Sequence, residues 1–105
     1  MCCLDAYDAT VFVEGSDTLR QRMADAGNGQ RLVQNFVDSA EHSYWGDAYY
    51  PPLFNALLNW VEKGQKPTPA GIAASCLQQP GAAAKDCRFM PDYVNKPLSS
   101  RVFLR

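Results

Sequence analysis

The chain has 105 residues, of which 47% are hydrophobic and 20% are charged, and its formal net charge is -1. This length suits one small soluble domain and is too short for a complete large α/β enzyme. The 10 basic residues balance the 11 acidic ones without a long run of either sign, which argues against nucleic acid or an anionic membrane as the main partner. The apolar stretches are far shorter than the roughly 18 residues of a membrane span.

The first part of the chain predicts a strand–helix–strand unit. Residues 9–14 form a β-branched and aromatic run, which is typical of a buried strand. Residues 18–26 favour a helix that starts after a capping Ser or Asp and stops at Gly27. A second strand is expected over residues 31–37, after an Asn-Gly turn. Short connections of this kind give a crossover between two parallel strands.

The rest of the chain predicts two helices and an irregular tail. The strongest pattern covers residues 53–63, where Pro51 and Pro52 precede a broad apolar face and Gly64 follows it. A short helix is expected over residues 69–77. Prolines and glycines then break the chain into loops that we expect to lie over a larger body. The whole chain is therefore expected to be one partial α/β domain, with two parallel strands and about three helices.

The cysteines leave two interpretations open. A disulfide between Cys76 and Cys87 would close a loop of about 11 residues and stabilise the fold by about 2–3 kcal/mol; the alternative is two unrelated buried thiols. A disulfide fits an oxidising compartment, although residues 1–5 lack the features of a signal peptide. No metal site is expected, because paired C-x-x-C motifs are absent and Asp5 and Asp8 lack a recognised metal spacing.

A sheet of two parallel strands is unusual by itself, because parallel sheets normally contain several strands with both faces covered. The chain is expected either to pair with itself or a partner, or to be the C-terminal part of a larger α/β protein. The residues around His42 favour the second interpretation.

The order of elements resembles the last two strands and final helix of an α/β-hydrolase. More closely, residues 10–66 are similar to the C-terminal region of secreted tannase/feruloyl-esterase-like hydrolases. The Cys-containing tail is more weakly similar to the same region. The similar segments are Gly29-Gln30-Arg31-Leu32, Ala40-Glu41-His42-Ser43 and Asn59-Trp60-Val61-Glu62-Lys63-Gly64-Gln65-Lys66-Pro67. The resemblance implies a partial hydrolase fold, with residues 9–66 as its C-terminal βαβα unit and residues 67–105 as a short helix and tail that pack on it. It also suggests a periplasmic or secreted protein.

Enzymes of this group cleave carboxylic esters with a Ser-His-Asp triad, which needs no cofactor. By resemblance His42 matches the histidine base, and a surface or packing histidine is the alternative. Asp17 matches the triad acid, although Glu14 stands where the group has a histidine and the turn is one residue shorter. Asp17 alternatively caps the following helix, and Glu14 is the fallback acid.

The aromatic residues that follow His42 are Trp45, Tyr49 and Tyr50. In a hydrolase they would line the substrate pocket, which suits aromatic esters. Packing under the final helix is the alternative.

The nucleophile is missing, because no Gly-x-Ser-x-Gly elbow occurs. The serines that lack this context are Ser16, Ser39, Ser43, Ser75, Ser99 and Ser100. The chain alone is therefore expected to be inactive and to supply the His, and by resemblance the Asp, of an ester hydrolase. Its expected partners are an ester substrate and an N-terminal hydrolase portion, or a second copy. The alternative function is a non-catalytic α/β binding or dimerisation module.

Overall fold

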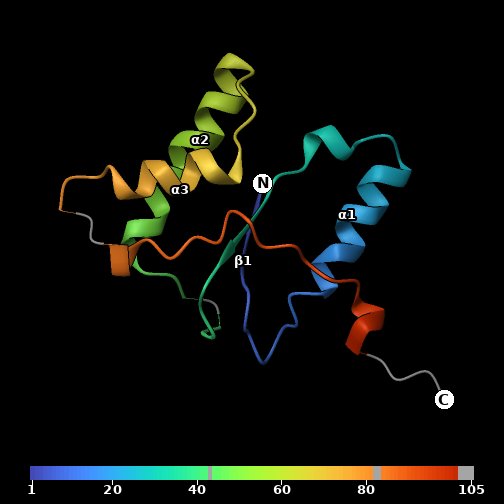
Figure 1. The fold of residues 1–105 in the computed structure, drawn as a ribbon. Helices are drawn as coiled ribbons and strands as arrows, with labels where there is room; N and C mark the ends of the chain where they lie inside the picture. Colours follow the sequence, from blue (N-terminus) through green and yellow to red (C-terminus); the bar gives the residue numbers. More distant parts are fainter. Residues whose placement is uncertain (43, 82–83, 102–105) are drawn as a thin grey trace.

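The computed structural model describes residues 1–42, 44–81 and 84–101. These residues form a mixed α/β structure, as the sequence predicts. Its two parallel strands and three α-helices are β1 (Cys2–Asp5), α1 (Gly15–Asp25), β2 (Gln34–Val37), α2 (Tyr50–Lys63) and α3 (Pro69–Leu77). The helices α2 and α3 lie on one side of the strands and α1 lies on the other (Figure 1). None of the described helices has the length and apolar character needed to span a membrane. The predicted loop residue Ser43 lies outside the described residues.

The first strand is not where the sequence predicts it. Residues 9–14 form turns and loop, and the strand is Cys2–Asp5, which pairs with β2 in register from Cys2–Gln34 to Asp5–Val37. The Asp8 carboxylate accepts the backbone N–H groups of Thr10 at 2.7 Å and Val11 at 3.0 Å. This side-chain turn uses donors that a sheet ladder would need, so it overrides the β propensity of the run.

The unit between the strands is also shifted. β2 covers only the end of the predicted strand, because Gly29–Arg31 forms a short 3-10 helix. α1 begins at Gly15, and its N-cap Glu14 makes no side-chain capping bond. Asp17 therefore lies in the first helical turn instead of capping the helix, and its negative charge there suits the helix dipole.

The predictions for the last two helices are confirmed. Both prolines lie in the first turn of α2, and Gly64 ends the helix with a φ of 67°, in the left-handed region that favours glycine. α3 spans the predicted residues, and the Thr68 hydroxyl accepts the Gly71 N–H at 3.1 Å. The apolar face of α2 is only partly covered, since Leu53 is buried while Phe54 is 62% exposed.

The core lies between β2, α2 and α3. Its buried members are Val37, Tyr49, Leu53 and Ile72. Val37 is completely buried, so the end of β2 is the point from which both helices are positioned.

The C-terminal segment covers the outer edge of β2. Phe89 forms an antiparallel bridge with Val37, the Asp38 N–H donates to the Arg88 carbonyl at 2.9 Å, and the Met90 N–H donates to the Phe36 carbonyl at 2.8 Å. Part of the tail that the sequence predicts to be irregular thus pairs through its backbone with the outer edge of β2.

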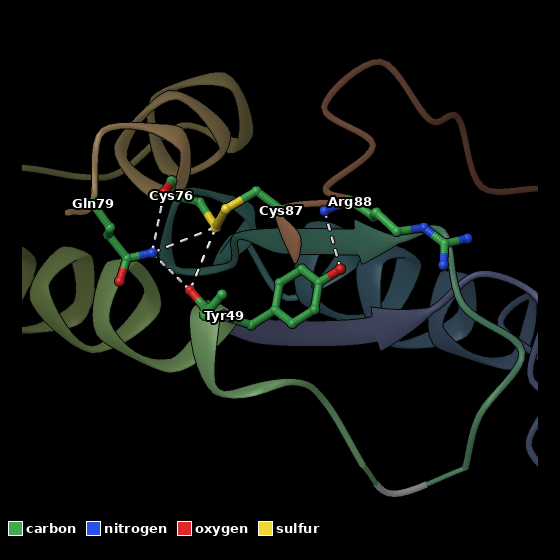
Figure 2. Close-up of a disulfide and its surroundings, with 6 residues drawn as sticks. Tyr49, Cys76, Gln79, Cys87 and Arg88 are labelled. Atoms are coloured by element: carbon green, nitrogen blue, oxygen red, sulfur yellow. Dashed lines mark hydrogen bonds between the residues drawn. A yellow bond between two sulfur atoms is a disulfide. The ribbon is translucent and has the colours of Figure 1, made fainter. Parts of the chain in front are cut away.

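The predicted disulfide is confirmed. Cys76 on α3 is bonded to Cys87, with 5.8 Å between the Cα atoms. Next to it the Tyr49 hydroxyl accepts the Arg88 N–H at 3.0 Å, and the Gln79 side-chain amide donates to the Ala48 carbonyl at 2.8 Å (Figure 2). The disulfide and these bonds hold the segment that covers β2 against α2 and α3.

Removal of the disulfide is therefore expected to lower the free energy of unfolding by about 2–3 kcal/mol, mainly because the unfolded chain gains freedom. The measurement is urea unfolding of a Cys76→Ala/Cys87→Ala variant. Cys2→Ala serves as the control, because it removes a thiol that is not in a disulfide. Equal stability of the double variant and the control would contradict this role.

Candidate active site

The two loops that follow the parallel strands bring His42 and Asp8 together. β1 ends at Asp5 and β2 ends at Val37, and the carboxyl ends of neighbouring parallel strands lie at one edge of a sheet. The loops that leave this edge carry Asp8 and His42. The His42 Nδ1 atom lies 2.8 Å from the Asp8 Oδ2 atom.

Asp8 is held so that it can orient the imidazole. Its Oδ1 atom accepts the two backbone N–H groups of the turn, which leaves Oδ2 for His42. The hydrogen bond from His42, together with the Val11 N–H, lowers the pKa of Asp8 below its usual value. Because a carboxylate only accepts, the hydrogen bond requires a proton on Nδ1 of His42. With Nδ1 protonated, a neutral imidazole has Nε2 as its acceptor. This is the arrangement of a general base with an orienting acid.

The pair lines a pocket of about 260 Å³. Phe12 and Trp45 supply apolar wall, and the indole N–H of Trp45 donates to Asp5 Oδ2 at 2.9 Å. His42 is 48% exposed, whereas Asp8 is 9% exposed. The imidazole is therefore accessible while the carboxylate is largely buried.

The residue beside His42 is not Asp17, the acid suggested by resemblance. Asp17 is 2% exposed, and its two oxygens accept from Arg20 at 2.6 Å and Gln21 at 2.7 Å on the same helix. The Arg20 bond lowers the pKa of Asp17. Within the part of the chain that the structure describes, no hydrogen bond joins Asp17 to His42.

The fallback acid Glu14 is also engaged elsewhere. Its carboxylate pairs with Arg101 at 2.6 Å, and this bond lowers the pKa of Glu14. The pair ties the C-terminal segment to the start of α1.

The three predicted aromatic residues have different surroundings. Trp45 and Tyr50 have ring centroids 6.2 Å apart and both line a second, apolar pocket of about 520 Å³. Tyr49 is 7% exposed and packs edge-on against Phe89 at 5.1 Å. Trp45 and Tyr50 thus remain candidates for contact with a ligand, whereas Tyr49 lies in the core.

A serine also lines the smaller pocket. The Ser16 hydroxyl donates to the Val13 carbonyl at 2.7 Å and accepts the Asn95 side-chain amide at 2.9 Å. The hydroxyl is therefore bonded to a backbone carbonyl and to a side chain of the C-terminal segment. Among the described residues it makes no hydrogen bond to His42. In the same residues, no group of three or more His, Cys, Asp or Glu side chains is placed to hold a metal ion.

Asp8 is the residue that sequence reasoning missed. Its signal was present, because an Asp three residues beyond the end of one strand and a His five residues beyond the end of its parallel neighbour belong to loops at the same sheet edge. That signal depends on placing the first strand at Cys2–Asp5.

Comparison with protein-family models, with curated proteins and with solved structures gave no match. Function is therefore inferred from the geometry of the pocket.

We expect His42→Ala to raise the pKa of Asp8 towards its usual value, because the bond that favours the ionised form is lost. The stability that Asp8 contributes through this bond is present above the usual Asp pKa and is lost as the pH falls through the lowered one. The measurement is a carboxyl ¹³C NMR titration. The pKa of Asp17 is the internal control and should stay low. A shift of Asp17 with no shift of Asp8 would contradict the pairing.

Proposed function

We propose that this chain supplies the His–Asp half of a carboxylic-ester hydrolase, with His42 as the base, Asp8 as the orienting acid, and a serine nucleophile from a separate polypeptide segment. The observation that supports this most directly is the 2.8 Å bond from His42 to Asp8 inside a lined pocket. The resemblance of the order of elements to an α/β-hydrolase supports the same chemistry.

The proposed reaction places the proton on His42 twice. Nε2 takes the proton of the serine hydroxyl as its oxygen bonds to the ester carbonyl carbon, and the imidazolium is stabilised by Asp8. The proton then passes to the departing alcohol as the acyl–oxygen bond breaks. Water repeats the sequence to release the carboxylic acid. Trp45 and Tyr50 would contact the substrate from the pocket wall.

The need for another segment comes from the serines. Ser16 lines the pocket, yet its hydroxyl is bonded to Val13 and Asn95, and a triad nucleophile must lie within hydrogen-bond reach of its base. Among the described residues, no serine hydroxyl is hydrogen-bonded to His42.

A second candidate function is a non-catalytic binding or dimerisation module. The apolar pocket of about 520 Å³ is the observation that favours it. In that case His42 would orient a loop and would take part in no reaction.

The proposal predicts that a fluorophosphonate probe labels a serine in a polypeptide that co-isolates with the tagged chain from its native host. We expect His42→Ala to slow the labelling by about 10²–10⁴-fold, and Asp8→Asn to slow it as well. Asp17→Asn is the matched control and should label at the wild-type rate once its folding is confirmed.

Two results would contradict the proposal. One is labelling of this chain itself that disappears in Ser16→Ala, which would make Ser16 the nucleophile. The other is the absence of any labelling that depends on His42.

A further inference from the structure

β1 leaves a row of backbone groups without a neighbouring strand. The Cys2 N–H donates to the Val33 carbonyl at 2.8 Å and the Ala6 N–H donates to the Val37 carbonyl at 2.9 Å. Since alternate residues of a parallel strand face the same neighbour, Cys3 and Asp5 direct their N–H and C=O groups away from β2. The outer edge of β2 is covered by the C-terminal segment, so β1 is the open edge among the described residues.

Two adjoining pockets follow this open edge. The apolar pocket of about 520 Å³ lies between the start of β1 and α2, where Phe54 is 62% exposed. The pocket of about 260 Å³ lies along the rest of β1. Cys3 and Trp45 line both pockets. We call the two together the β1 groove.

Asp5 indicates what kind of side chain belongs in the groove. Asp5 is 8% exposed and its Oδ2 atom accepts from Trp45, but its buried Oδ1 atom has no hydrogen-bond donor among the described residues. A buried carboxylate oxygen without a donor is costly and rare in folded proteins. Asp8 and His42 line the same pocket and are hydrogen-bonded to each other, so the Asp5 Oδ1 atom is the acceptor that favours a positively charged donor at the polar end of the groove.

We propose that the β1 groove binds an extended segment of another polypeptide, which adds as a strand to β1, places an apolar side chain in the larger pocket and directs a Lys or Arg side chain to Asp5. The backbone of the segment would pair with Cys3 and Asp5, as in recognition by strand addition. The proposal goes beyond ester hydrolysis, because it does not require His42 to act as a base.

A second copy of this chain fits the groove less well. Its own strand has the sequence Cys-Cys-Leu-Asp, which brings no nitrogen or hydroxyl donor to Asp5. It would add another carboxylate at the same edge.

The test uses two capped heptapeptides of alternating valine and threonine, one with a central arginine and one with a central leucine. We expect the arginine peptide to slow hydrogen exchange of the Cys3 and Asp5 amides and to bind about tenfold more tightly than the leucine peptide. Asp5→Asn should remove this preference. Asp25→Asn is the control, because it changes an exposed Asp at the end of α1. Phe54→Asp, also at an exposed position, should weaken both peptides and covers the case in which Asp5→Asn fails to fold.

Equal affinity for the two peptides would overturn the proposal, as would unchanged exchange of both amides. Protection of these amides in a dimer before any peptide is added would also overturn it, since a second copy would then occupy the edge. Because the assay measures binding without an ester or a probe, its failure is distinct from failure of the serine-labelling experiment.

Discussion

Backbone pairing on both edges of β2 is the constraint on which the rest of this small structure depends. One edge pairs with β1 and the other with the segment around Phe89, so Val37 is fully enclosed although the sheet has two strands. The Cys76–Cys87 disulfide and the Tyr49 hydroxyl hold that segment in place. A chain of this size buries only a small hydrophobic core. The disulfide at the sheet edge therefore supplies stability that a further strand would otherwise supply.

The parallel pairing also decides where His42 and Asp8 meet. It brings the loops after β1 and β2 to one edge, and the side-chain turn at Asp8 then fixes one carboxylate oxygen on backbone and directs the other to His42. The same bonds that stop residues 9–14 from forming a strand therefore orient the imidazole. The Asp8 carboxylate therefore determines both the local turn and the orientation of His42.

The elements governed by local rules could be predicted from the sequence. α2 is defined by prolines in its first turn and by a left-handed glycine at its end, and α3 is defined by a threonine cap. The disulfide between Cys76 and Cys87, which are 11 residues apart, was one of two interpretations that the sequence allowed. β1 could not be predicted, because Cys-Cys-Leu-Asp becomes a strand only by pairing with β2, some 30 residues away. The misplaced strand also explains the choice of acid. Asp17 is the acid that follows residues 9–14, whereas Asp8 is the acid that follows Cys2–Asp5.

The open edge of β1 and the His42–Asp8 pair line the same pocket, so a segment that binds at the edge would also lie beside the imidazole. Part of the exposed apolar surface lies beside β1, where Phe54 is 62% exposed. Cys3 and Trp45 line both pockets of the β1 groove, including the pocket that His42 lines. A strand added there would remove water from around a half-exposed imidazole and strengthen its bond to Asp8, because electrostatic interactions grow as the local dielectric falls. A covered edge would therefore hold His42 and Asp8 in a drier environment than the isolated chain provides.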